Sequence, residues 1–457
     1  MPKTHQSKLS ALFPGQALLS DDISRKYSVD WSAENACMPD IVIKAKSVKD
    51  VSKLLAYCDS EKLPLVTQGG MTGLSGGATP QAGEIVLSME ALTGITEIDP
   101  DSMTISVLAG TPLERVQQAV RDAGFYLPLD LGARGSCTIG GNVSTNAGGT
   151  QVLSYGMTRA LVLGLEAVTA DGTIIRSMNK MLKNNAGYDL KQLFIGSEGT
   201  LGVVTEVVLR MLPLANCKFS ALCAFKNFSD VVVFLRAMQS DLSRVTAFEL
   251  MWSNYIEQVL FMNPSCVDPF QEKHPLYVLI EAEGSNVQRD GEQFEQALSH
   301  QMEQGGLIDA VVAQNNTQAN QFWKIRDGVT AILAQVPELA NFDIGLPVSQ
   351  MEVFVERVEE ALVSAFDNLT LCTFGHMADG NLHIFAWTGV AGDVEKIYQY
   401  VYRAVGEYGG TITAEHGVGA MKRKYLPHCR TNEELALMRT LKQAMDPNGI
   451  LNARRVI

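Results

Sequence analysis

Three of the seven histidines in the chain lie in two short glycine-containing segments, and a glutamate stands next to one of them. The first segment contains His376 and His383, and the second contains Glu415 and His416. Imidazole nitrogens and carboxylate oxygens are ligands that zinc and similar divalent ions take in proteins. The spacing of the first two histidines is no standard zinc motif, so the residue types also fit histidines that only hydrogen-bond within a core. The pattern therefore indicates either a metal site or a buried polar turn.

A second stretch with chemical potential spans residues 64–80, where five glycines fall within nine positions. Glycine adopts positive φ without steric cost, so consecutive N–H groups can turn toward one anion such as a phosphate. No Lys-Ser/Thr pair follows the last glycine, as a P-loop requires, and Ile85–Ser88 predicts a strand where a dinucleotide fingerprint needs a helix. A phosphate-binding loop is indicated, and a flexible Gly/Ser linker is the alternative.

A companion loop at residues 129–149 again combines glycines with short hydroxyl and amide side chains. The short apolar strand predicted at residues 63–66 leads directly into the first loop. Two such loops in one chain indicate an extended ligand that contains a diphosphate.

The residues around both loops predict an α+β domain with mixed strands. Ser47 is expected to cap one helix, and Thr111, Pro112 and Glu114 are expected to form a capping box that begins another. The first domain is expected to end near Leu214. The predicted strands are residues 41–43, 63–66, 95–98, 103–108, 162–168, 173–176 and 202–209.

The elements become longer after Phe219, which indicates a second domain. The predicted elements are strands 221–225, 246–251, 276–281 and 384–387 and helices 230–239 and 351–365. The order β-α-β-β-α-β is typical of a ferredoxin-like sheet.

Length and composition limit the class of protein. A chain of 457 residues is too long for one compact core and predicts two or three domains. The net charge of −13 argues against nucleic acid or an anionic membrane surface as the main partner, because both require a basic face. The eight cysteines include no Cys-x-x-Cys pair, the N-terminus has no signal-peptide core, and no apolar run approaches about 18 residues. We therefore expect a cytoplasmic protein with reduced thiols and no membrane span.

The first loop resembles the pyrophosphate loop of the vanillyl-alcohol-oxidase-type FAD flavoproteins. The second loop and residues 183–205 resemble the D-2-hydroxy-acid dehydrogenase branch of that family, and the resemblance runs from about residue 40 to the C-terminus. It implies an α+β fold with a two-part FAD-binding domain of the vanillyl-alcohol-oxidase/PCMH type at residues 1–214 and 411–457. A ferredoxin-like cap domain that binds substrate would occupy residues 215–410. FAD would be bound non-covalently, because the first loop has no histidine for attachment.

The resemblance also implies which residues bind FAD. They lie in the two loops, in the segment around residue 200 and in the C-terminal tail: Gly69, Gly70, Met71, Thr72, Gly73, Leu74, Ser75, Gly135, Ser136, Cys137, Gly140, Gly141, Asn142, Ser144, Thr145, Gly148, Glu198, Gly202, Val203 and Asn452. In the same tail, Arg454 or Arg455 could face the flavin or be a surface arginine.

In the D-2-hydroxyglutarate and D-lactate dehydrogenases of this fold, the residues that match His376, His383 and Glu415 bind zinc, and the match to His416 is the general base. The chemistry agrees with these residue types. Oxidising an α-hydroxy acid removes the hydroxyl proton while a hydride leaves C2 for the flavin. A divalent metal lowers the pKa of the hydroxyl, and a histidine can take its proton.

Two further positions, by resemblance, contact the substrate. Arg326 would clamp the substrate carboxylate with its planar fork, although the residue alone also fits a solvated helix position. Thr330, one turn later on the same face, would make a second contact. The D-2-hydroxyglutarate enzymes have a lysine in place of Asn341 and an asparagine in place of Phe385, so this chain lacks a cation for a second carboxylate and has an apolar ring in place of a donor. A shorter or less charged D-2-hydroxy acid, such as lactate, is therefore also consistent with the sequence.

These observations predict an FAD- and zinc-dependent dehydrogenase that converts a D-2-hydroxy acid to the 2-oxo acid. A flavin oxidase that uses oxygen and a non-catalytic flavin electron-transfer subunit are the alternatives. The electron acceptor, a quinone or an electron-transfer flavoprotein, and the oligomeric state, for which a homodimer is one option, stay open.

Overall fold

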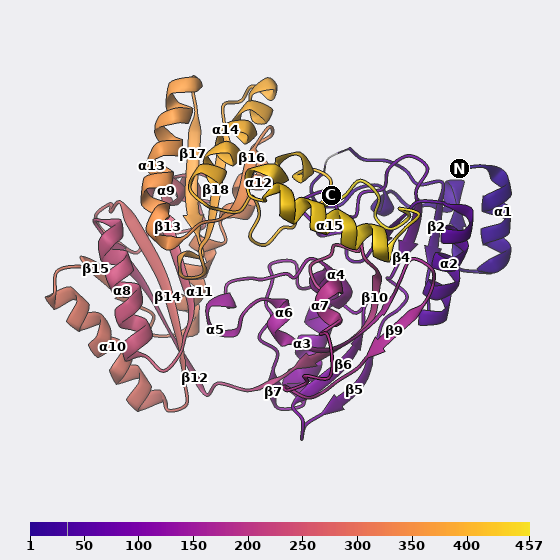
Figure 1. Ribbon diagram of the computed structural model, residues 1–457. Coiled ribbons are helices and arrows are strands. Elements are labelled where there is room, and N and C mark those ends of the chain that lie inside the picture. Colours follow the sequence, from indigo (N-terminus) through magenta and orange to yellow (C-terminus); the bar gives the residue numbers. More distant parts are fainter. Residues whose placement is uncertain (34) are drawn as a thin grey trace. The chain divides into compact units, whose positions relative to one another are not determined.

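The computed structural model describes residues 1–33 and 35–457 and divides the chain into two compact units (Figure 1). Unit 1 consists of Met1–Gly149, Tyr155–Leu214 and Glu415–Ile457, and unit 2 consists of Thr150–Ser154 and Ala215–Ala414. Unit 1 is thus discontinuous in sequence, and its last segment follows unit 2. The domain ends predicted from the sequence are 214 and 410, and the units change at 214 and 414.

Unit 1 is built from short strands and helices. Its strands are β1 Ala17–Leu19, β2 Ile41–Lys44, β3 Leu65–Gln68, β4 Ile85–Ser88, β5 Ile95–Asp99, β6 Thr104–Leu108, β7 Phe125–Tyr126, β8 Val162–Val168, β9 Ile174–Ser177, β10 Val203–Arg210 and β11 Leu212–Pro213. Its helices are α1 Lys3–Leu12, α2 Val48–Glu61, α3 Leu113–Asp122, α4 Ile139–Ser144, α6 Thr158–Leu161, α7 Lys191–Phe194 and α15 Asn432–Met445, with 3₁₀ turns η1 Ser20–Asp22, η2 Arg25–Tyr27 and η5 Arg423–His428. Helix α5, Val152–Tyr155, lies where the chain changes units.

Two sheets form the framework of unit 1. A four-stranded sheet has the order β1-β2-β4-β3, in which β2, β4 and β3 are parallel and β1 is antiparallel. A five-stranded sheet has the order β5-β6-β10-β8-β9 and is antiparallel throughout. The predicted α+β arrangement with mixed strands is therefore confirmed. The glycine-rich loop begins directly after β3, as predicted.

One predicted helix start is correct and another is wrong. Ser47 accepts a hydrogen bond from the backbone of Asp50 and forms a capping box at the start of α2. At the start of α3, Pro112 is the N-cap and no side chain caps the helix. The hydroxyl of Thr111 instead donates to the carbonyl of Leu108 at 2.7 Å and accepts from the N–H of Gly94. These two hydrogen bonds thus use the hydroxyl that the predicted capping box required.

Unit 2 has longer elements. Its strands are β12 Cys217–Phe225, β13 Val245–Trp252, β14 Leu276–Gly284, β15 Asp309–Val312, β16 Ala340–Gly345, β17 Thr370–Gly375 and β18 Asn381–Trp387. Its helices are α8 Phe228–Asp241, α9 Ser253–Met262, α10 Val287–Glu303, α11 Asn316–Arg326, α12 Val329–Gln335, α13 Val348–Ala365 and α14 Val394–Glu407, with 3₁₀ turns η3 Met377–Asp379 and η4 Ala391–Asp393.

The strands of unit 2 form one seven-stranded sheet with the order β15-β12-β14-β13-β17-β18-β16. Its first four strands have the ferredoxin-like order, and α8 and α10 pack together against them (Figure 1). Helix α9, between β13 and β14, was not predicted. It packs with α11 and α12 against the opposite face of the sheet in a separate apolar cluster.

The register places the chemically important side chains of unit 2 on one face of its sheet. Asp343 pairs with His383, and Asn341 pairs with Phe385. Directly opposed residues in antiparallel strands point to the same face, as do residues two apart along a strand. The sheet therefore gathers these four side chains. In the described part of the chain, no helix is both long and apolar enough to span a membrane.

Candidate functional site

The hairpin between β17 and β18 positions His376 and His383. His376 follows the last residue of β17 and is the N-cap of η3, and Gly380 closes the turn at a φ of 86°. His383 lies in β18, where its ring stacks on Phe374 at a centroid distance of 4.9 Å. The two histidine rings are 5.5 Å apart and nearly perpendicular. Because both residues are buried, the turn holds two imidazoles close together in a water-poor environment.

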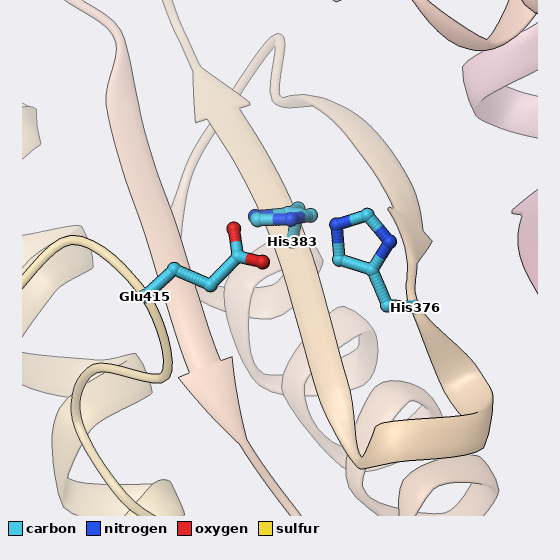
Figure 2. Close-up of side chains that lie close together, drawn as sticks. All are labelled: His376, His383 and Glu415. Carbon is cyan, nitrogen blue, oxygen red and sulfur yellow. The ribbon is translucent and has the colours of Figure 1, made fainter. Parts of the chain in front are cut away.

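Glu415 completes a group of three potential metal ligands with these histidines. One ligand atom from each residue lies within 4.8 Å of the others, and Figure 2 shows the carboxylate directed toward the histidine pair. Glu415 directly follows the last residue of unit 2, Ala414, whose N–H donates to the carboxylate of Asp343. A second group of three, which shares Glu415, consists of Asp343, Glu415 and His416.

The donor set fits a zinc-like ion. Two imidazoles and one carboxylate are a ligand set of catalytic zinc sites, which leave a position open for water or substrate. The sequence analysis named these three residues, and the structure brings them together.

Glu249 is a site residue that the sequence analysis missed. It lies on β13 and is almost fully buried, at 1% exposure. Its Oε1 is 2.7 Å from Nδ1 of His376, and its Oε2 accepts from Nε of Arg326 at 2.8 Å. Burial would raise the pKa of this carboxyl, but its interactions with His376 and Arg326 outweigh burial and hold the pKa below its usual value. A glutamate within a mostly apolar strand is the sequence signal that could have revealed it.

Arg326 is buried, so the alternative of a solvated helix position is wrong. Besides its bond to Glu249, its Nη2 lies 3.1 Å from Nε2 of His376. Burial opposes the charge of the guanidinium, but the carboxylate of Glu249 raises the pKa of Arg326 above its usual value. The nearby turn carries a further carboxyl, Asp379, whose pKa burial raises to about 6.

Thr330 does not continue the helix of Arg326. Helix α11 ends at Arg326, and Thr330 belongs to the separate helix α12. Its side chain is exposed and donates to the carbonyl of Asp327 at 3.1 Å. The expectation that Thr330 lies one turn later on the same helix face is therefore wrong, because the helix is interrupted at Gly328. A contact between Thr330 and the substrate stays a prediction.

Asn341 and Phe385 lie on the same sheet face as the metal-ligand candidate His383. Phe385 is 2% exposed and packs against Phe374. In the described part of the chain, the side-chain oxygen of Asn341 is buried without a hydrogen-bond partner. Asn341 and Phe385 are opposed in register, and His383 lies two residues before Phe385. A group placed at position 341 therefore faces the neighbourhood of the histidine pair.

The two glycine-containing loops of unit 1 touch each other. A Cβ atom on Gly70 would lie 2.1 Å from the carbonyl oxygen of Ser136, and one on Gly69 would lie 2.5 Å from the hydroxyl of Thr138. Gly70 thus allows the two backbones to approach this closely, and Gly69 leaves room for the side chain of Thr138. Within the described part of the chain, no protein group accepts a hydrogen bond from the backbone N–H of any residue from 69 to 77.

The loops fit a diphosphate-bearing cofactor. A series of consecutive N–H groups that the protein leaves available can bind phosphate oxygens, and the side chains beside them are small. A flexible linker would not pack so closely against a second loop, so the structure argues against that alternative.

Glu198 and Asn452 use their side chains within unit 1. The carboxylate of Glu198 accepts from the N–H groups of Val418 and Gly419 at 2.7 and 2.8 Å. Its pKa is raised by burial, which outweighs these hydrogen bonds. The amide of Asn452 donates to the carbonyl of Glu198 and accepts from the N–H of Thr67. Both residues therefore anchor the C-terminal segment, and contacts with FAD stay predictions.

The other FAD residues named from the sequence fall into two groups. Cys137, Gly140, Asn142 and Val203 are buried, and a Cβ on Gly202 would meet the ring of Phe194, so these positions pack the core beneath the loops. The remaining ones lie in or beside the loops: Met71, Thr72, Gly73, Leu74, Ser75, Gly135, Gly141, Ser144, Thr145 and Gly148.

Comparison with protein families matches most of the chain. Residues 39–177 match a family described as FAD binding domain, and residues 216–456 match the C-terminal domain of FAD linked oxidases. A relative from Arabidopsis thaliana, named D-2-hydroxyglutarate dehydrogenase, mitochondrial, is 37% identical over 94% of this chain and 77% of its own length. A relative from Xanthomonas citri pv. viticola, named D-2-hydroxyglutarate dehydrogenase, is 37% identical over 93% of this chain and 91% of its own length.

Solved structures share the fold. A structure of p-cresol methylhydroxylase with substrate bound superposes with a TM-score of 0.79 over 99% of this chain and 96% of that chain, at 14% identity. A structure of alkyldihydroxyacetonephosphate synthase gives a TM-score of 0.75 over 99% of this chain and 85% of that chain, at 16% identity. The predicted fold of the FAD-binding type is confirmed.

Proposed function

The chain belongs to the family of FAD-linked oxidases that includes the D-2-hydroxyglutarate dehydrogenases, and on this premise we propose that it oxidises a D-2-hydroxy acid to the 2-oxo acid. The observation that carries the proposal is the grouping of His376, His383 and Glu415, whose ligand atoms lie within 4.8 Å of one another. A fold that binds FAD without such a group would leave the hydroxyl of the substrate without an activating charge.

Different residues of the chain bind the metal, bind the substrate and accept the proton. His376, His383 and Glu415 hold zinc or a similar divalent ion, which, when bound, lowers the pKa of a coordinated hydroxyl. Arg326 binds the substrate carboxylate, because a guanidinium offers two parallel donors to it. His416 takes the hydroxyl proton on an imidazole nitrogen.

The two loops of unit 1 hold FAD without a covalent bond. Bound FAD supplies the acceptor for the hydride that leaves C2 of the substrate. The hydroxyl of Ser75 donates to the carbonyl of His416 at 3.0 Å, so the first loop also fixes the backbone of the proposed base.

The substrate is either 2-hydroxyglutarate or a less charged D-2-hydroxy acid. The names of the relatives support the first. The second is supported by the lack of a cation at Asn341 and of an amide donor at Phe385, two residues that oppose each other on β16 and β18. We propose the less charged acid, with lactate as the simplest example.

Replacing Asn341 with lysine is expected to shift the preference toward D-2-hydroxyglutarate. A lysine there would supply a charge for the second carboxylate, and a hydrogen bond to a charged group contributes about 1.5–3 kcal/mol. The ratio of kcat/KM for D-2-hydroxyglutarate to that for D-lactate should therefore rise by roughly 10- to 100-fold. Steady-state kinetics with both acids measures this ratio.

The matched control is Asn341→Met, which adds similar length without charge and should not raise the ratio. An unchanged ratio in Asn341→Lys would show that position 341 does not face the distal part of the substrate.

Anaerobic mixing with a panel of D- and L-2-hydroxy acids tests the function itself. We expect bleaching of the flavin absorbance by at least one D-acid and by no L-acid, and we expect prior chelation of metal to slow it by at least about 100-fold, since metal activation contributes several kcal/mol. Bleaching that is equally fast after chelation would remove the metal from the mechanism. No bleaching by any acid would instead favour an electron-transfer subunit.

Exposure of the reduced protein to air distinguishes a dehydrogenase from the remaining alternative, a flavin oxidase. A dehydrogenase reoxidises slowly in oxygen, whereas an oxidase reoxidises within its turnover time. The natural acceptor is proposed to be a quinone or an electron-transfer flavoprotein, and the location to be the cytoplasm. The cytoplasmic location is supported by the eight cysteines, which are all free thiols.

A further inference from the structure

We propose that Glu249 is a positioning residue whose two carboxylate oxygens orient the metal ligand His376 and the substrate-binding Arg326 together. The inference rests on the proposed function, because it assigns a role to Glu249 through those two residues. Glu249 itself would touch neither substrate nor metal.

The contacts are short and buried. The distance from Oε1 of Glu249 to Nδ1 of His376 is 2.7 Å, and that from Oε2 to Nε of Arg326 is 2.8 Å. All three residues lie within unit 2 and are less than 9% exposed. The pairing of Leu250 with Gly375 places Glu249 on β13 beside the turn that carries His376. The sheet register therefore sets this geometry.

The contacts of His376 with Glu249 and with Arg326 select the same tautomer. An ionised carboxylate only accepts hydrogen bonds, so Nδ1 of His376 must carry the proton that Glu249 accepts. Arginine only donates, and its Nη2 lies 3.1 Å from Nε2 of His376. Nε2 therefore presents its lone pair. This is the tautomer in which Nε2 can bind a metal ion, and a carboxylate partner on the other nitrogen is the usual way to fix it.

The same carboxylate links metal binding to the arginine. One lone pair on Nε2 serves one partner, so a metal ion bound there replaces the contact with Nη2 of Arg326. The bond from Nε of Arg326 to Glu249 is independent of Nε2 and can persist. The guanidinium then keeps its anchor while an N–H group becomes available, which is what binding of a substrate carboxylate requires.

A buried ion cluster that only stabilises the sheet is the competing explanation. In that case the partners of His376 would be interchangeable with any contacts that keep the unit folded, and zinc affinity would depend on folding alone. The chain offers a matched residue to separate the two explanations. Glu281 lies on the neighbouring strand β14, is 4% exposed, and accepts hydrogen bonds from Trp323 and Lys218.

The experiment compares zinc affinity in wild type, Glu249→Gln and Glu281→Gln. Each full-length protein is freed of metal and titrated with zinc against a chromophoric chelator, so the result does not depend on activity. We expect Glu249→Gln to bind zinc roughly 10- to 100-fold more weakly, as is typical when the partner of a metal-ligating histidine is lost. Glu281→Gln should bind zinc within about twofold of wild type, although it loses a buried carboxylate of the same kind.

The outcomes separate the inference from the proposed function. If wild type binds zinc and Glu249→Gln binds it equally tightly, the role of Glu249 is wrong and the proposed metal site stands. If Glu281→Gln loses as much affinity as Glu249→Gln, the cluster is only structural and the inference is again wrong. If wild type binds no zinc, the metal site of the proposed function fails, and this inference fails with it.

A second measurement on the unaltered protein covers the case in which Glu249→Gln does not fold. Nitrogen chemical shifts of ¹⁵N-labelled histidine report which ring nitrogen carries the proton, and His376→Gln identifies the signal. We expect the proton on Nδ1 in metal-free wild type, and a change at Nε2 when zinc is added. A proton on Nε2 in the metal-free protein would overturn the inference.

Discussion

Replacing Arg455 with methionine is expected to lower the free energy of unfolding by about 3–5 kcal/mol, because one charge of a buried ion pair would lose its partner. The side chain of Arg455 is completely buried, and its two Nη atoms donate to the two carboxylate oxygens of Glu84 at 2.7 and 2.8 Å. It also donates to the carbonyls of Thr79 and Ala453. Urea denaturation followed by circular dichroism measures the loss.

The consequence should reach the first loop, since Thr79 lies in its last part and Glu84 follows shortly after it. We expect the ratio of flavin to protein absorbance in purified Arg455→Met to fall as well. The neighbouring Arg454 is exposed, so Arg454→Met should change stability by no more than about 0.5 kcal/mol.

A double variant tests the physical cause. Replacing both Glu84 and Arg455 with methionine removes the unpaired charge and should recover part of the lost stability. If Arg455→Met alone unfolds within about 1 kcal/mol of wild type, the buried pair does not hold the C-terminal segment.

The buried ion pair of Arg455 could not be predicted from the sequence. A tail arginine is consistent with a surface position or with a contact to the flavin, and nothing in its neighbours distinguishes these from a buried pair. Its partner, Glu84, is 371 residues away in sequence. Only the return of the last segment to unit 1 brings the two together, and no local pattern encodes that return.

Local patterns predicted most of the elements. Alternation and helical spacing placed the main strands and helices, because side-chain periodicity follows directly from backbone geometry. The capping box at Thr111 failed because its hydroxyl bonds instead with Leu108, at the end of β6, and with Gly94, which directly precedes β5. Helix α9 was missed because it lies between two strands that were expected to be joined directly.

The sequence pointed to the potential metal ligands of the candidate site but not to the residue that hydrogen-bonds to one of them. The residue types and glycine-containing turns of His376, His383 and Glu415 indicated a metal site or a buried polar turn, and the resemblance to the D-2-hydroxy-acid dehydrogenases named the three as metal ligands. The contact of Glu249 with His376 depends on the pairing of β13 with β17, which joins residues more than 100 positions apart. Pairing of that kind is set by the whole sheet, so it could not be read from any one segment.

Replacing His416 with glutamine is expected to slow anaerobic flavin reduction by roughly 10²- to 10⁴-fold, which is the usual contribution of a general base. The substitution keeps a polar side chain but cannot take up a proton near neutral pH. The backbone contact of His416 with Ser75 should survive, because it uses only the carbonyl oxygen. Stopped-flow absorbance with the best D-2-hydroxy acid of the panel measures the rate.

Three further readings decide whether the loss is catalytic. The FAD content and the zinc affinity of His416→Gln should equal those of wild type, since the proposed ligands are His376, His383 and Glu415. His428 is exposed, so His428→Gln should reduce the flavin within about twofold of the wild-type rate, which separates loss of the base from loss of any histidine. If His416→Gln keeps more than half of the wild-type rate while FAD and zinc are bound, another group accepts the proton. Asp343, which shares the second ligand group with Glu415 and His416, would then be the residue to replace.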